Sequence, residues 1–245
     1  MLGVAGILLG ILTLVWQDFN TWQQIEPLGA IPHRDILADI FAAIEIIGGV
    51  AIQWRRAARA GAVALGGVFT VFALLWVPRI LAHPLTYDPW GNFFEQSSQV
   101  AGCLIVFDAG RKQKLARSAY LLFAICVISF MLEQLLNLSA TASFVPKWIP
   151  PGQMFWSVVT TMAFAAAALA LLTGRYALWA SRLLTAMIIG FGLLAWLPRL
   201  ADPHQLFNWA GNAVNLSIAA AAWVVADFLS ESADGSRSIA KTTAA

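Results

Sequence analysis

Long apolar stretches separated by short polar ones run along the whole chain. Each apolar stretch holds roughly 17–22 residues, enough for a helix to cross a hydrocarbon core about 30 Å thick. The pattern predicts an all-α membrane protein with eight transmembrane helices: Leu2–Phe19, Ile36–Trp54, Ala58–Val77, Trp90–Phe107, Ser118–Leu138, Met154–Leu172, Leu178–Leu197 and Trp209–Leu229. Pro78 and Pro198 are expected to end the third and seventh helices, because proline lacks the N–H that continues the helical hydrogen bonding.

The composition indicates that the lipid bilayer is the natural solvent of the chain. Hydrophobic residues make up 60% of the 245 residues, charged residues make up 11%, and the mean hydropathy is +0.73. A soluble domain is nearer one half apolar and one quarter charged. No basic patch with interleaved aromatic residues is present, so nucleic-acid binding is not indicated. Residues 230-245 are polar and small, and we expect them to form a disordered cytoplasmic tail.

The basic residues fall mainly on one side of the predicted spans. Eleven of the fifteen Lys and Arg residues lie in the second, fourth and sixth connections or in the tail. The positive-inside rule then predicts a multi-pass protein of the cell membrane with both termini in the cytoplasm. Tryptophans near the span ends are expected to form an interfacial belt rather than core contacts: Trp16, Trp22, Trp54, Trp76, Trp90, Trp148, Trp196 and Trp209.

The two halves of the chain share a sequence pattern. Residues 74–82 read LLWVPRILA, and residues 194–201 read LAWLPRLA. Gly91 and Asn92 recur 120 residues further along as Gly211 and Asn212. Duplication is the economical explanation. It predicts two four-helix bundles, 1-112 and 113-229, which cross the membrane in the same direction because each has an even number of helices.

Several short motifs carry a family resemblance. The first predicted helix ends in Trp16-Gln17-Asp18-Phe19, an Ile-Pro pair precedes the second, and that helix holds Glu45-Ile46-Ile47-Gly48-Gly49 before an Arg cluster. A Pro-rich loop at 145–151 follows in the second half. On these motifs the chain resembles the DoxX/DoxD-like membrane proteins, across both halves. The resemblance implies a subunit or accessory of a membrane redox system, with quinone as cofactor and a redox protein as partner. That family usually has one four-helix unit, so the duplication is a departure.

Ionisable residues within the predicted spans are the candidates for function, because charge in a bilayer is expensive. The candidate ligand-binding residues are Glu45, Arg79, Asn92, Glu95, Glu133 and Arg199. Arg79 is the expected partner of Glu95 or Glu45, and Arg199 that of Glu133. These groups form either structural ion pairs or a pocket in which Arg holds an anionic or carbonyl oxygen while a carboxylate relays protons. The first repeat keeps more of them and is expected to hold the site, open to the extracytoplasmic side.

Catalytic motifs do not appear in the sequence. It has no nucleotide-binding or hydrolase signature, and its His and Cys residues lack the spacing of haem or metal ligands. Enzymatic activity therefore stays open. Three functions remain: a quinone-linked redox subunit, a small-molecule transporter or permease, and a structural or assembly protein that could form homo-oligomers. Glycines within the spans, Gly48, Gly49, Gly61, Gly66, Gly67, Gly190 and Gly192, are expected to allow close helix packing.

Overall fold

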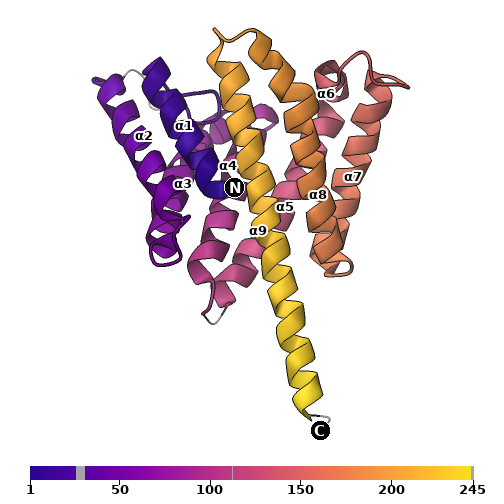
Figure 1. Ribbon diagram of the computed structural model, residues 1–245. Helices are drawn as coiled ribbons and strands as arrows, with labels where there is room; N and C mark the ends of the chain where they lie inside the picture. Colours follow the sequence, from indigo (N-terminus) through magenta and orange to yellow (C-terminus); the bar gives the residue numbers. More distant parts are fainter. Residues whose placement is uncertain (26–30, 112, 244–245) are drawn as a thin grey trace.

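All regular secondary structure is helical in the part of the chain that the structure, a computed structural model, describes: residues 1–25, 31–111 and 113–243, with side chains as far as Ser232. The helices are α1 (Leu2–Trp16), α2 (Arg34–Ala51), α3 (Ala58–Ala82), α4 (Asp88–Asp108), α5 (Lys114–Leu136), α6 (Leu138–Phe144), α7 (Gln153–Thr173), α8 (Ala177–Phe191) and α9 (Leu206–Thr243) (Figure 1). No strand is present within these ranges. The all-α prediction is confirmed, whereas the short helix α6 was not predicted.

Five helical segments are long and apolar enough to cross a membrane: Ala58–Ala82, Lys114–Leu136, Gln153–Thr173, Ala177–Ala201 and Leu206–Ser232. Helix α1 is apolar but has only 15 residues. Helices α2 and α4 are less apolar, since Glu45 lies inside α2 and several polar residues lie inside α4. Length and composition thus support a membrane protein.

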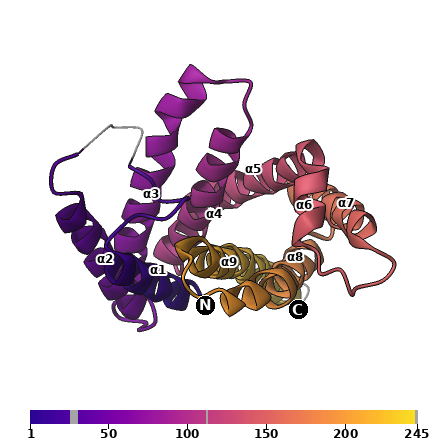
Figure 2. The ribbon, with the colours of Figure 1, turned by 90° about the horizontal axis from the view of Figure 1, so that it is seen from above.

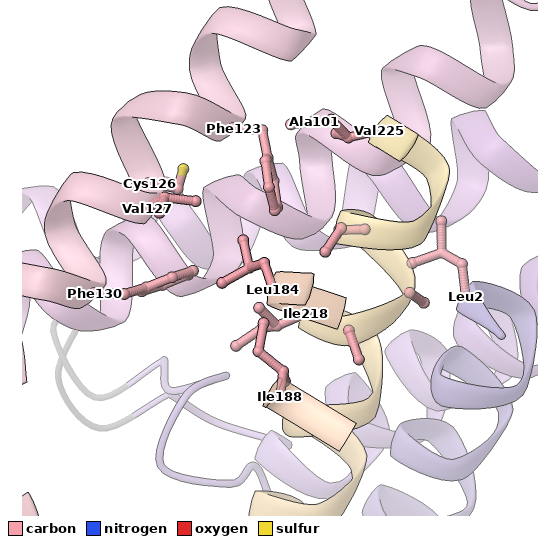
Figure 3. Packing of buried hydrophobic residues seen from close by; sticks show 14 of the residues in the cluster. Leu2, Ala101, Phe123, Cys126, Val127, Phe130, Leu184, Ile188, Ile218 and Val225 are labelled. Carbon is pink, nitrogen blue, oxygen red and sulfur yellow. The ribbon is translucent and has the colours of Figure 1, made fainter. Parts of the chain in front are cut away.

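The eight longer helices follow one another around a closed path. Each packs against its neighbour in the chain, with α5 meeting α7 beyond α6, and α9 returns to pack against α1. Helices α4 and α9 also pack against each other in the middle (Figure 2). Side chains from both halves meet there in one apolar cluster, as Leu2, Ala101, Phe123, Leu184 and Ile218 show (Figure 3). The halves therefore share a core.

Glycines bring α1, α2 and α3 together at backbone distance. A Cβ atom built on Gly49 of α2 would lie 2.5 Å from the carbonyl oxygen of Gly3 and 2.9 Å from the nitrogen of Ile7. Gly61 of α3 lies against the backbone of α2 at Gly48. The predicted close packing is confirmed at these positions. It is wrong at Gly67 and Gly190, where a Cβ would meet nothing within 4 Å.

The two prolines do not end their helices as predicted. Helix α3 continues through Pro78 to Ala82. The proline removes one helical hydrogen bond, but the last turn still closes with a bond from His83 N to Arg79 O at 2.9 Å. The segment before Pro198 instead changes its winding. Helix α8 passes into a π-helical turn at Gly192–Trp196 and a 3₁₀ turn at Leu197–Ala201. The halves therefore differ in backbone winding at this point.

The end of the chain also departs from the prediction of a disordered tail at 230-245. Helix α9 continues to Thr243 and extends beyond the other helices (Figure 1). Extending an existing helix is far easier than nucleating a new one, because each added residue gains a hydrogen bond. Low hydrophobicity alone therefore did not predict the backbone conformation of this segment.

Candidate ligand-binding site

Helix α4 carries a run of polar side chains into the middle of the protein. Five consecutive polar residues, Glu95, Gln96, Ser97, Ser98 and Gln99, follow the buried Asn92, and the last four of the five are buried as well. Gln96 is 0% exposed, and neither of its amide atoms has a hydrogen-bond partner among the described residues. Unpaired buried amides destabilise a protein, so their presence points to a role for α4 beyond packing.

A cavity of about 510 Å³ lies beside this helix, bounded by α4, α5, α6, α7, α8 with its π-helical turn, and α9. Aromatic and aliphatic side chains form most of the wall, including Phe130, Phe144, Phe164, Phe191, Trp156 and Trp196. Its polar lining consists of Asp88, Glu95, Glu133, Gln134, Asn137, Thr141, Thr160 and Asn215. None of the described lining residues is basic.

Three carboxyl groups share one wall of the cavity. Asp88 and Glu95 come from α4 and Glu133 from α5, and the three interact electrostatically. The Glu133 carboxyl group rests on Gly91, where an added Cβ would lie 3.0 Å from Oε2. Glu95 Oε2 is buried and accepts no hydrogen bond from the described residues. Within the described ranges, no three His, Cys, Asp or Glu side chains come close enough to hold a metal ion.

Gln134 lines the cavity next to Glu133, and Tyr87 lies near the same glutamate. The Gln134 oxygen accepts hydrogen bonds from the hydroxyl groups of Thr160 and Thr161, both at 3.1 Å, which leaves the amide nitrogen as a donor. The Tyr87 hydroxyl lies 2.9 Å from the carbonyl oxygen of Ser129, to which it donates. Burial, together with the negative charge of Glu133, raises the pKa of Tyr87 above its usual value, so the phenol stays a neutral donor.

A residue of the connection between α1 and α2, Trp22, packs against the wall of this cavity. Trp22 is 8% exposed, stacks on Phe207 at 5.4 Å between ring centroids and meets the ring of Trp196 at 6.0 Å. Its indole also lies beside the Glu95 carboxyl group, and its carbonyl accepts a hydrogen bond from Trp76 Nε1 at 3.1 Å. The interfacial belt is therefore wrong for Trp22 and Trp76, which are core residues.

The structure brings two of the six predicted site residues, Glu95 and Glu133, into one cavity. Asn92 lies on the same helix but is buried and donates to the carbonyl oxygen of Asp88 at 2.8 Å. Glu45 lies elsewhere, at 1% exposure, and accepts a hydrogen bond from Gln23 at 2.5 Å.

The two arginines lie at the ends of their helices. Arg79 stacks over Trp76 at 5.4 Å and donates to Gln24 at 3.3 Å, beside a separate outer depression. Arg199 lies over the ring of Phe144 at 4.0 Å, so its predicted pairing with Glu133 is wrong. The half-buried ring of Phe144 gives the guanidinium a close contact instead. A salt bridge at 2.7 Å instead joins Asp18 to Arg34, between the ends of α1 and α2.

The cavity does not lie within the first half of the chain, where the site was predicted. Helix α4 of the first half supplies Asp88 and Glu95, while α5 to α9 of the second half supply Glu133 and most of the walls. Asp88 and Gln134 were missed. Asp88 precedes the predicted span and looked like a loop residue, although it begins α4. The polar run after Asn92 was the signal in the sequence that could have identified α4 as the central helix.

Gly91→Ala is expected to move the Glu133 carboxyl group into the cavity. The added methyl meets the far end of a flexible side chain, so the free energy of unfolding should fall by less than about 1 kcal/mol. Labelling of Glu133 by a hydrophobic carbodiimide, measured by mass spectrometry, should increase several-fold. Gly67→Ala is the control, and equal labelling in the two variants would contradict the placement of Glu133 on Gly91.

Comparisons with known proteins leave the family open. No family model matches the chain, and no curated protein or solved structure matches it. The DoxX/DoxD-like resemblance therefore stays a prediction, and the function must be argued from the site.

Proposed function

We propose that the chain forms an eight-span membrane protein, built by duplication of a four-helix unit, that binds a small and largely apolar molecule in the cavity between its halves. The closed path of helix contacts supports the spans, since α1, α2 and α4 complete the same layer as the five long apolar helices. We also propose that both termini lie on the cytoplasmic side. The basic connections α2–α3, α4–α5 and α7–α8 lie at the same end of the helices as the C-terminus in Figure 1, which supports this orientation.

Matching local contacts support the duplication. Arg79 stacks over Trp76 at 5.4 Å, and Arg199 stacks over Trp196 at 5.7 Å. The indole of Trp90 donates to the carbonyl of Pro84, and that of Trp209 to the carbonyl of Pro203, at 3.2 and 3.0 Å. Glu95 and Asn215, which are 120 residues apart, line the same cavity. Such pairs follow naturally if α9 is the counterpart of α4.

The cavity is the observation that carries the proposed binding function. A volume of about 510 Å³ lies in the range of small-molecule sites, and apolar walls with a few polar groups at one side are typical of them. A purely structural protein has no need of three carboxyl groups and an unpaired carboxylate oxygen beside such a space. A carrier or permease, which binds its substrate between helices near the middle of the membrane, is the function that this geometry supports best.

A quinone-linked redox role is the second candidate, and Gln134 is the observation that favours it. Its amide nitrogen is turned away from Thr160 and Thr161 and could donate to a quinone carbonyl, while a neighbouring carboxyl group could exchange protons. This role would also require a redox partner protein. The two candidates predict different molecules in the same cavity.

Gly190→Leu tests the binding function directly. Gly190 lines the cavity, and a Cβ there would meet nothing within 4 Å, so the leucine side chain should narrow the cavity without displacing its neighbours. We expect a small molecule to co-purify with the wild-type protein in lipid nanodiscs and to be at least tenfold depleted in Gly190→Leu, as measured by solvent extraction and mass spectrometry.

Gly67→Leu is the matched control, because Gly67 is equally open but does not line the cavity. A bound quinone would favour the redox role, and another amphiphile would favour the carrier. Equal contents of every extracted molecule in the wild type and the Gly190→Leu variant would contradict binding in this cavity.

A further inference from the structure

The composition of the cavity wall points to the class of its ligand. We infer that the cavity selects a lipophilic organic cation, which places its positive charge beside Asp88, Glu95 and Glu133 and its apolar body against the aromatic wall. The inference rests on the proposed binding function and specifies its substrate class.

The charge of the lining is the first argument. Three carboxyl groups from two helices face one space, and no described lining residue carries a positive charge that would balance them. Glu95 Oε2 is buried without a hydrogen-bond partner among the described residues. Carboxylates close together in a low-dielectric site repel one another, and a cation within the site relieves that repulsion. An anionic ligand would add to it.

The spacing of the carboxyl groups is the second argument. A bound metal ion needs several ligands that converge on one point, and no three acidic, His or Cys side chains do so in the described part of the chain. The groups are spread along a wall instead, with Glu133 held back against Gly91. Such a wall suits a delocalised or bulky cation better than a compact ion.

The aromatic wall is the third argument. The faces of aromatic rings attract cations, most strongly where water is excluded. Phe130, Phe164, Phe191 and Trp196 line the cavity on the side of α5, α7 and the π-helical turn. Two lining rings already hold a cation of the protein itself, since the Arg199 guanidinium lies 4.0 Å from the centre of Phe144 and 5.7 Å from that of Trp196. An apolar cation would find both charge complementarity and stacking partners.

Binding of two ions of the same shape and opposite charge tests the inference. Purified protein in nanodiscs of neutral lipid would be dialysed against radiolabelled tetraphenylphosphonium and, separately, tetraphenylborate. We expect the wild type to bind the phosphonium at least tenfold more tightly than the borate. Glu95→Gln and Glu133→Gln should each weaken phosphonium binding about tenfold, which is a loss of one charge–charge interaction at low dielectric.

Asp35→Asn is the matched control, because Asp35 is exposed at the start of α2 and its loss changes the net charge equally. Thermal unfolding would check that each variant folds, and Asp88→Asn replaces a glutamate variant that does not. A neutral short-chain benzoquinone serves as the third probe, and its affinity should be unchanged in the glutamine variants.

The outcomes distinguish a failure of the selection of cations from a failure of the binding function itself. Equal affinity for the two ions, or unchanged phosphonium binding in the glutamine variants, would overturn the selection of cations. If Gly190→Leu still removed the binding of any probe, the binding function would stand. If no probe bound to the wild type, or Gly190→Leu affected none, the binding function itself would fail.

Discussion

Gly49→Ala should destabilise the protein, whereas the same substitution at Gly67 should stabilise it. Alanine is favoured over glycine inside a helix by about 1 kcal/mol, so the change by itself stabilises α2 and α3 alike. At Gly67 the new methyl meets nothing within 4 Å, and only this gain remains. At Gly49 the methyl would lie 2.5 Å from the carbonyl oxygen of Gly3. Helices α1 and α2 must then separate, at a cost of about 1–3 kcal/mol for overpacking.

The measurement is thermal unfolding of both variants in one detergent, followed by tryptophan fluorescence, with the monodisperse fraction measured by size-exclusion chromatography. We expect opposite shifts of the apparent Tm, down for Gly49→Ala and up or unchanged for Gly67→Ala. Gly49→Leu should yield little folded protein. An apparent Tm at or above the wild-type value for Gly49→Ala would show that α1 and α2 do not approach at this glycine.

Periodicity and length predicted the helices well. A membrane helix must satisfy its own backbone hydrogen bonds, so it spans the bilayer as one continuous segment and appears in the sequence as a long apolar stretch. The predicted spans Met154–Leu172 and Ala58–Val77 fall within α7 and α3. Glycine spacing similarly predicted the close contact at Gly49. These features depend on neighbouring positions along one or two helices, and a sequence shows those directly.

The site could be predicted only in part, because it depends on which helix faces lie opposite one another. Glu95 and Glu133 stood out as charges within apolar spans, yet nothing in the sequence indicated that α4 and α5 would turn them toward the same space. Arg199 was assigned to Glu133 by charge alone and in fact contacts Phe144. Its preference for an aromatic ring depends on α6, a helix too short to appear in the hydropathy pattern.

Assignment of the site to the first repeat failed for a related reason. The first half has more ionisable residues within its predicted spans, which favoured it as the location of the site. A binding cavity also depends on the side chains that form its walls. The π-helical turn at Gly192–Trp196 supplies part of those walls and has no counterpart in α3, which continues as an α-helix through Pro78. Such turns are often found at functional sites. The cavity thus lies where the backbone of the second half differs from that of α3.

Trp22→Ala is expected to destabilise the protein by about 3–5 kcal/mol, the usual range for removing a buried tryptophan side chain. The indole stacks on Phe207, meets the ring of Trp196 and lies beside the Glu95 carboxyl group, so one side chain joins the α1–α2 connection to the wall of the cavity. Its removal should loosen the contact between the two halves. Access to Glu95 should widen at the same time.

Trp22→Phe separates packing against Phe207 from the contact with Glu95. Phenylalanine keeps a ring against Phe207 but is smaller than the indole and has no N–H group beside Glu95, so we expect a small decrease of the apparent Tm together with increased carbodiimide labelling of Glu95. Trp22→Ala should show both a large decrease and strong labelling. Trp148→Ala, at a residue that is 74% exposed, is the control and should change neither. Unchanged labelling in both Trp22 variants would mean that the indole does not cover the Glu95 carboxyl group, and the cavity would then have to be closed by other side chains.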